Sequence, residues 1–181
     1  MAEQSNADEA GAIPDIPIRM DHEGPIEPLS RLEASLLFAQ ISRISYLQPH
    51  AVNRYIPRLG LRLENFADRD GAQAYIFGSD TDIVVACRGT EPNDWNDVKA
   101  DVNAVMVLAE TVGRVHRGFK QEVDDLWPEL ENVIATDERT LWFTGHSLGG
   151  AMATISAGRC YLAHIPAVPK AVYTFGAPRV G

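Results

Sequence analysis

The chain has 181 residues, which is long enough for one domain with a buried core. Its formal net charge of −9 at pH 7 argues against a nucleic-acid partner. No apolar run approaches the roughly 18 residues that a membrane-spanning helix needs, and the N-terminus lacks the basic and apolar regions of a secretory signal. We therefore expect no transmembrane segment, and a protein that is cytoplasmic or exported by a route not visible in the sequence.

The acidic charge is concentrated at the N-terminus. Residues 1–28 contain seven acidic residues, one basic residue and four prolines, without a sustained apolar period. Such a composition favours a solvated or loosely draped segment. We expect residues 1–28 to form a disordered acidic tail and residues 29–181 to form the folded domain.

The first helix is predicted from a capping box, in which Ser30 is the N-cap and Glu33 follows three residues later. Apolar residues at helical spacing carry this helix to about Gln48. The segments predicted as strands are Arg62–Phe66, Ala72–Phe77, Ile83–Cys87, Thr140–Gly145 and Ala171–Phe175. Two further helices are expected at Gly118–Thr136, broken or restarted at Pro128, and at Ser147–Leu162. Strands that alternate with helices indicate an α/β fold, a mostly parallel sheet with helices on both faces.

The sequence contains no recognisable cofactor or metal site. It lacks a P-loop, a Gly-x-Gly-x-x-Gly fingerprint and a His-Glu-x-x-His motif. The two cysteines, Cys87 and Cys160, have no metal-ligand spacing, and we expect both to be buried small hydrophobic residues. No cofactor and no metal are therefore predicted.

The most informative motif is Gly145-His146-Ser147-Leu148-Gly149, between the predicted strand ending at Gly145 and the predicted helix that follows. A Gly-x-Ser-x-Gly turn between a strand and a helix is typical of a nucleophile elbow, which exposes the serine hydroxyl. Gly145 and Gly149 are needed because side chains there would collide with neighbouring elements. An ordinary glycine-rich turn carries the same pattern by chance, but the strand–turn–helix context favours Ser147 as a nucleophile.

A serine nucleophile requires two oxyanion donors. The N–H of Leu148, directly after the serine, is the expected first donor. The second donor normally follows a neighbouring central strand, and here the strand Ile83–Cys87 runs into Arg88-Gly89-Thr90. We therefore predict that Thr90 completes the oxyanion hole, although a plain strand-ending turn would read the same way in isolation.

Four motifs follow in order along the chain: Val84–Thr90, Val115–Phe119, Gly145–Gly150 and Thr174–Gly181. Their order and approximate spacing resemble those of the class 3, fungal-lipase-type lipases, and the resemblance covers roughly residues 60–181. This resemblance implies an α/β-hydrolase fold and a serine carboxylester hydrolase of the triacylglycerol lipase type. Its substrate would be an acyl ester or lipid at a lipid–water interface. Cys87 stands where the family more often has an aromatic residue, and His116 falls in a motif position that implies a structural role.

The resemblance also implies a lid between the oxyanion loop and the Val115–Phe119 motif. Trp95, Val98 and Val102 recur at helical spacing within residues 91–107, which we take as the candidate lid. Such a helix would cover the serine in water and open at a lipid surface. An ordinary amphipathic surface helix would show the same periodicity.

The catalytic acid and base are missing from the pattern. In α/β-hydrolases the triad follows the chain order serine, acid, histidine, yet no Asp or Glu follows Ser147. The single downstream histidine, His164, is expected beyond the far end of the helix that starts at the elbow, and His146 is expected to point away from the serine. We expect a lipase fold that is incomplete at the C-terminus, with weak or no hydrolase activity.

Two alternative functions remain open. A phospholipase A1 or a short-chain esterase would carry the same motifs, because the residues of the acyl pocket cannot be located from them. A catalytically inactive lipid-binding or scaffold module is an alternative of another class.

Overall fold

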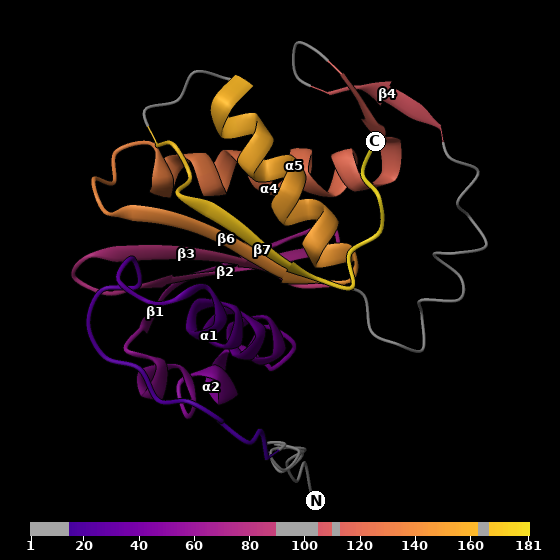
Figure 1. Cartoon of the computed structure of the whole chain (residues 1–181). Helices are drawn as coiled ribbons and strands as arrows, with labels where there is room; N and C mark the ends of the chain where they lie inside the picture. Colours follow the sequence, from indigo (N-terminus) through magenta and orange to yellow (C-terminus); the bar gives the residue numbers. More distant parts are fainter. Residues whose placement is uncertain (1–14, 90–104, 110–112, 163–166) are drawn as a thin grey trace, which may run out of the picture.

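The computed structural model describes residues 15–89, 105–109, 113–162 and 167–181. Its central feature is a sheet with the strand order β1-β2-β3-β6-β7 (Figure 1). The strands are β1 (Arg62–Arg69), β2 (Ala72–Gly78), β3 (Asp82–Cys87), β6 (Thr140–His146) and β7 (Ala171–Phe175). All five predicted strands are therefore present, and the predicted α/β fold is confirmed.

The sheet is mixed, with its parallel half around the elbow. β3 pairs with β6 and β6 pairs with β7 in parallel, whereas β1, β2 and β3 are joined by antiparallel pairings. The β1–β2 hairpin turns at Asp70 and Gly71, which both have positive φ, of 51° and 94°. Positive φ at both central residues defines a type I′ turn, whose twist matches that of the flanking strands. The antiparallel edge of the sheet is thus specified locally.

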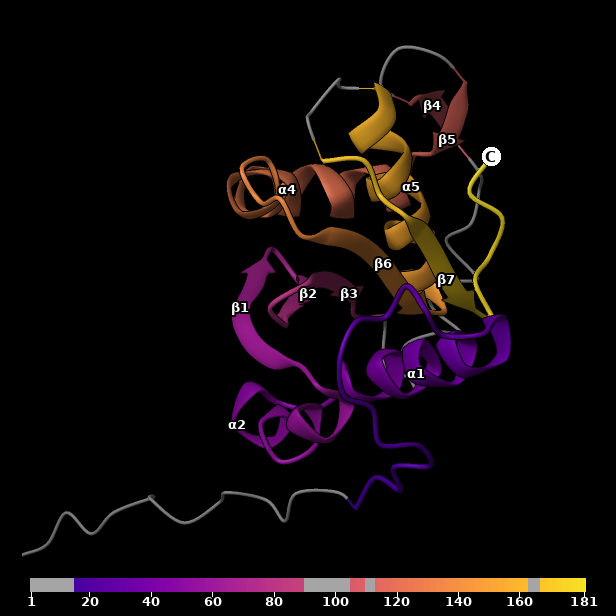
Figure 2. The same ribbon diagram turned by 60° about the vertical axis from the view of Figure 1, so that its left-hand side comes forward.

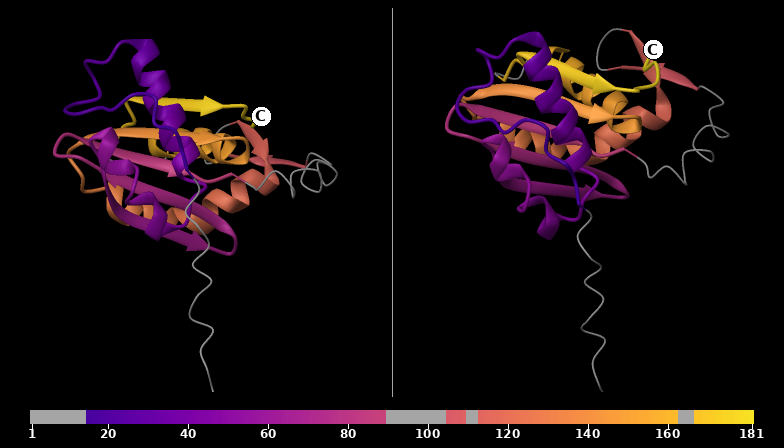
Figure 3. Two further views of the ribbon diagram at one scale, coloured as in Figure 1. Left: turned by 90° about the horizontal axis from the view of Figure 1, so that it is seen from below. Right: turned by 60° about the horizontal axis from the view of Figure 1, so that its bottom comes forward.

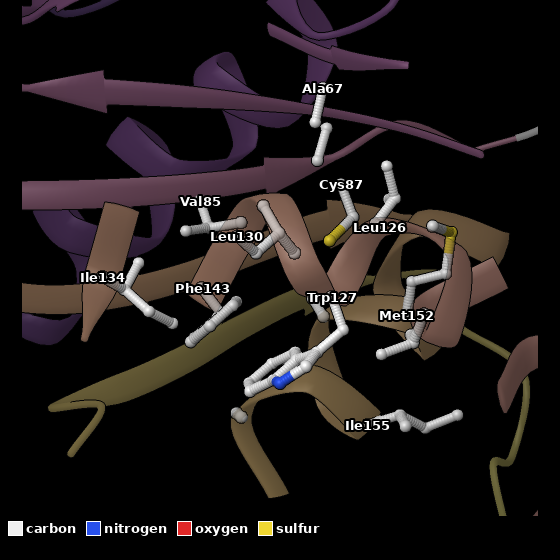
Figure 4. Packing of buried hydrophobic residues seen from close by; sticks show 14 of the residues in the cluster. Ala67, Val85, Cys87, Leu126, Trp127, Leu130, Ile134, Phe143, Met152 and Ile155 are labelled. Atoms are coloured by element: carbon white, nitrogen blue, oxygen red, sulfur yellow. The ribbon is translucent and has the colours of Figure 1, made fainter. Parts of the chain in front are cut away.

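Helices cover both faces of this sheet (Figure 2). On one face lie α4 (Arg117–Ile134) and α5 (Leu148–Leu162). Their contacts with the sheet include Val85, Cys87, Leu130 and Phe143, all fully buried (Figure 4). Burial of this kind contributes about 25 cal/mol per Å² of apolar surface. Cys87 and Cys160 are both buried, as predicted, and burial raises the pKa of each thiol to about 12.

The opposite face carries α1 (Arg31–Ile44), with α2 (Pro49–Val52) and the 3-10 turn η1 (Ile56–Leu59) after it. Figure 3 shows α1 lying across the sheet. The predicted capping box is present: the Ser30 hydroxyl accepts from Glu33 N, and the Glu33 carboxylate accepts from Ser30 N. The helix ends at Ile44, four residues before the predicted boundary at Gln48.

Pro128 does not interrupt α4, contrary to our expectation. The proline lies on the exposed side of the helix. The helix keeps a continuous buried face on both sides of Pro128, formed by Phe119, Val123, Leu126, Trp127, Leu130 and Ile134. Proline in a helix interior costs about 3 kcal/mol, and tertiary packing of this face outweighs that local preference.

The N-terminal segment is more ordered than its composition suggests. Residues 15–28, expected to belong to a loose tail, include Ile16 and Ile26, which are 7% and 2% exposed. The Gln40 side chain of α1 accepts from Met20 N at 3.2 Å and donates to Met20 O at 3.1 Å. Two apolar anchors and this paired amide hold the segment on the α1 face, while residues 1–14 lie outside the described part.

A buried carboxylate joins this segment to the sheet. Asp82, at the start of β3, is 1% exposed. It accepts hydrogen bonds from the Trp142 indole at 2.7 Å, from Ile26 N at 3.2 Å and from the Thr81 hydroxyl at 2.6 Å. Three donors satisfy the carboxylate oxygens, so this polar group stabilises the junction despite its burial.

A second, two-stranded sheet lies beyond the helices. β4 (Met106–Leu108) and β5 (Arg114–His116) pair antiparallel, and we did not anticipate them. The residues after β7 return to this hairpin, because His116 N donates to Val180 O at 2.8 Å. Among the described residues, no helix has the length and apolar character needed to cross a membrane.

The Asp82 junction gives a stability prediction. Asp82→Asn should lower the free energy of unfolding by about 1–3 kcal/mol, because the amide group places an N–H against buried donors. The control is Asp80→Asn at a side chain that is 99% exposed, where a change below about 0.5 kcal/mol is expected. Urea unfolding of both variants measures the difference, and equal effects would contradict this assignment.

Candidate active site

The predicted elbow lies between β6 and α5. Ser147 has φ 57°, a left-handed conformation that is rare for residues with a side chain. Its N–H donates to Phe175 O of β7 at 2.9 Å, and its carbonyl accepts from Gly150 N at 3.0 Å. Strain of this kind costs roughly 1–3 kcal/mol and persists where surrounding structure fixes it, which is common at functional sites.

Two glycines of the motif allow this turn, as expected. A Cβ at Gly145 would overlap the backbone of Gly149 and lie 2.7 Å from Gly150 N. A Cβ at Gly149 would overlap Cys87 O and lie 2.8 Å from Gly89 N. The start of α5 therefore packs directly against the backbones of both β6 and β3.

The exit of β3 lies beside the elbow because these strands are in register. Cys87 pairs with Gly145 across the parallel β3–β6 ladder. Gly89 continues from β3, and a Cβ there would lie 2.6 Å from His146 O and 3.3 Å from Gly149 N. The predicted oxyanion residue Thr90 follows immediately in the sequence but lies outside the described residues.

Leu148 is the first residue of α5. The first N–H groups of a helix have no carbonyl partner within the helix and lie at the positive end of its dipole. The Leu148 N–H therefore has the environment that an oxyanion donor requires. Ser147 and Leu148 themselves are partly exposed.

The histidines nearest the motifs have separate environments. His146 is exposed, and its Nδ1 lies 3.0 Å from the Tyr46 hydroxyl. His116 precedes α4, where its ring lies 4.4 Å from that of Phe119 between centroids. Neither ring nitrogen of His116 has a hydrogen-bond partner. The structural role expected for His116 stays a prediction.

Several predicted residues cannot be placed. Trp95, Val98 and Val102 of the candidate lid lie outside the described residues, as does His164. The described end of the lid range, Val105–Val107, runs into strand β4 and is not helical. In the described ranges no group of three or more His, Cys, Asp or Glu residues is placed to hold a metal ion.

Tyr46 is the contact to the elbow that the sequence did not reveal. It follows α1, one hundred residues before His146, and it belongs to no motif. Its position depends on how α1 crosses the sheet, so no local signal could have identified it.

The family model for Lipase (class 3) matches residues 84–181. A triacylglycerol lipase, OBL1, of Arabidopsis thaliana is 28% identical over 142 residues, covering 55% of this chain and 27% of the relative. A phospholipase A1-II 1 of Oryza sativa subsp. indica is 30% identical over 128 residues, covering 55% and 32%. The chain thus spans about a third or less of the length of these relatives.

Solved structures show the same fold. The triacylglyceride lipase of Rhizomucor miehei aligns with a TM-score of 0.72 at 23% identity, covering 84% of this chain and 65% of that one. A lipase from Rhizopus microsporus var. chinensis aligns with a TM-score of 0.66 at 25% identity, covering 91% and 64%.

The close approach at the elbow predicts unequal effects of two alanine substitutions in α5. Gly149→Ala should lower the free energy of unfolding by at least about 2 kcal/mol, because its methyl group overlaps backbone atoms that cannot move independently. Gly158→Ala is the matched control, since nothing lies within 4 Å of a Cβ there, and it should stabilise the helix by up to about 1 kcal/mol. Urea unfolding measures both, and a neutral Gly149→Ala would contradict the packing described.

Proposed function

Since this chain belongs to the class 3 lipase family, we propose that it cleaves carboxylic esters of lipids through an acyl-enzyme on Ser147. The observation that carries this proposal is the left-handed Ser147 between β6 and the first N–H groups of α5. A nucleophile and a preorganised donor are adjacent in this arrangement.

The proposed acylation step forms a bond between Ser147 Oγ and the ester carbonyl carbon. The carbonyl oxygen becomes an oxyanion that accepts hydrogen bonds from the N–H of Leu148 and from Thr90. Collapse of this intermediate breaks the bond to the leaving alkoxide, which takes up the proton lost by the serine. Water then releases the acid and regenerates Ser147. Both proton transfers require a base.

The base is the part of the machinery that these 181 residues do not supply in the expected order. No Asp or Glu follows Ser147, and His164 is the single histidine after it. We propose that the acid and histidine of the triad lie outside this sequence. Without this acid and this histidine most of the rate is lost, while the oxyanion hole and substrate binding still give a small residual rate.

The substrate class is proposed from the relatives. Both a triacylglycerol lipase and a phospholipase A1 match the chain. Of these we favour neutral acylglycerols, in agreement with the motif order of fungal-type lipases. Phospholipase A1 activity is the second candidate, favoured by the somewhat higher identity of the rice relative.

A first experiment compares slow hydrolysis of p-nitrophenyl butyrate with and without added imidazole. We expect a low rate that Ser147→Ala abolishes, and a Ser147-dependent increase when imidazole replaces the missing base. The reaction of imidazole with the ester is subtracted with the Ser147→Ala protein. Ser156→Ala is the matched control, because this buried serine has no hydrogen-bond partner at its hydroxyl and its loss should leave the rate within twofold.

Two results would contradict this account. A fast rate without imidazole, abolished by Ser147→Ala, would show that the chain already holds its base. No Ser147-dependent rate and no adduct with a fluorophosphonate, together with vesicle binding that survives Ser147→Ala, would indicate the inactive lipid-binding module instead.

A second experiment determines the substrate class under the same conditions. Tributyrin and trioctanoin emulsions are compared with phosphatidylcholine vesicles, and released acid is measured by titration. We expect faster release from the triacylglycerols than from the phospholipid. Release confined to the sn-1 chain of the phospholipid would assign the chain to the phospholipase A1 group.

A further inference from the structure

Tyr46 lies where three separate segments meet. Its hydroxyl is 3.0 Å from His146 Nδ1 and donates to His146 O at 3.4 Å. The two rings meet edge to face, with centroids 5.9 Å apart. A Cβ at Gly89 would overlap the same hydroxyl. The phenol oxygen therefore touches both the last residue of β6 and the exit of β3.

Hydrogen bonds hold the backbone on both sides of Tyr46. The Ser45 hydroxyl donates to Ser42 O at 2.8 Å, and Tyr75 of β2 donates to Leu47 O at 2.6 Å. Ser45 is fully buried, and Tyr75 is fully buried as well. The residues on either side of Tyr46 are thus bound to α1 and to the sheet.

A second polar chain links α1 to the strand that carries the elbow. The Ser42 hydroxyl lies 2.8 Å from Thr144 Oγ1, and Thr144 Oγ1 donates to Tyr173 O at 2.9 Å. Thr144 is three residues before Ser147, so α1 is anchored close to the elbow itself. Buried and satisfied networks of this kind rigidify the elements they join.

The side chain of His146 connects Tyr46 to the turn after β7. Its Nε2 lies 3.6 Å from the position of a Cβ on Gly176, which directly follows β7. The imidazole is therefore held between the Tyr46 hydroxyl and the turn after β7. Its backbone precedes Ser147, whose N–H is bound to the carbonyl of Phe175.

We propose that Tyr46 is a positioning residue that sets the separation between the β3 exit and the elbow, acting through His146. Leu148, the expected oxyanion donor at the elbow, directly follows Ser147, so the position of its N–H relative to Gly89 depends on this separation. Displacement of a catalytic group by about 1 Å can cost about a hundredfold in rate. The inference rests on the proposed role of Ser147. Its structural part, that Tyr46 restrains the backbone of the elbow, can be measured without turnover.

The test compares Tyr46→Phe with Tyr161→Phe. The control tyrosine, at the end of α5, is 57% exposed and donates its hydroxyl to Pro169 O at 3.2 Å. We measure the rate constant for fluorophosphonate labelling of Ser147, with imidazole present, by intact-mass analysis. Tyr46→Phe should lower the maximal labelling rate about tenfold with little change in the half-saturating concentration, and Tyr161→Phe should stay within twofold.

A double-mutant cycle with His146→Phe tests whether Tyr46 acts through His146. The pair Tyr46→Phe and His146→Phe should label no more slowly than the slower single variant, because each removes the same link. Multiplicative losses would overturn transmission through His146. A labelling rate unchanged in Tyr46→Phe would overturn the positioning role.

Amide hydrogen exchange separates this proposal from the proposed function. Peptides covering residues 145–150 should exchange faster in Tyr46→Phe than in the unmodified chain or in Tyr161→Phe. If the unmodified chain is not labelled at all, the role proposed for Ser147 fails, and the exchange data alone decide on Tyr46. Unchanged exchange in these peptides would overturn the hold on the elbow.

Discussion

The site depends on direct contact between the backbones of β3, β6 and the start of α5. Gly145 and Gly149 allow this contact within the motif, and Gly89 allows it from the neighbouring strand. A single methyl group at any of the three would meet backbone or side-chain atoms closer than real Cβ contacts. The proposed oxyanion hole needs backbone N–H groups that face one reacting atom, and the absence of side chains at these three glycines lets the segments lie close enough for that.

Polar contacts on the α1 face of the sheet hold these backbone segments in place. The Ser42–Thr144 pair anchors α1 to β6 near the elbow, and Asp82 anchors the N-terminal segment at the opposite end of β3. Apolar packing alone would allow α1 to slide across the sheet, because dispersion and burial are not directional. Buried hydrogen bonds have a narrow geometry, and they therefore define where Tyr46 meets the elbow.

The sequence could predict the five strands of the main sheet and the turn that holds Ser147, because these are encoded locally. The capping box at Ser30, the turn at Asp70 and the elbow at Ser147 each involve a few consecutive residues with a specific backbone requirement. Pro128 was misjudged, because its local cost is offset by a helix face that packs on a distant sheet. The order of residues 15–28 and the role of Tyr46 depend on contacts between segments far apart in the chain, for which composition and periodicity hold no signal.

Neighbouring described elements support the strained backbone at Ser147. Its N–H is bound to β7, its carbonyl to the first turn of α5, and the preceding residue to Tyr46. The backbone at Ser147 is therefore held by β6, β7, α5 and the segment after α1. Whatever group removes its proton must approach from the carboxyl-terminal edge of the parallel strands, since the helices α4 and α5 cover one face of the sheet and α1 covers the other (Figure 2). For the nucleophile proposed at Ser147, the backbone conformation is thus set by these elements, and the group that removes its proton has a separate task.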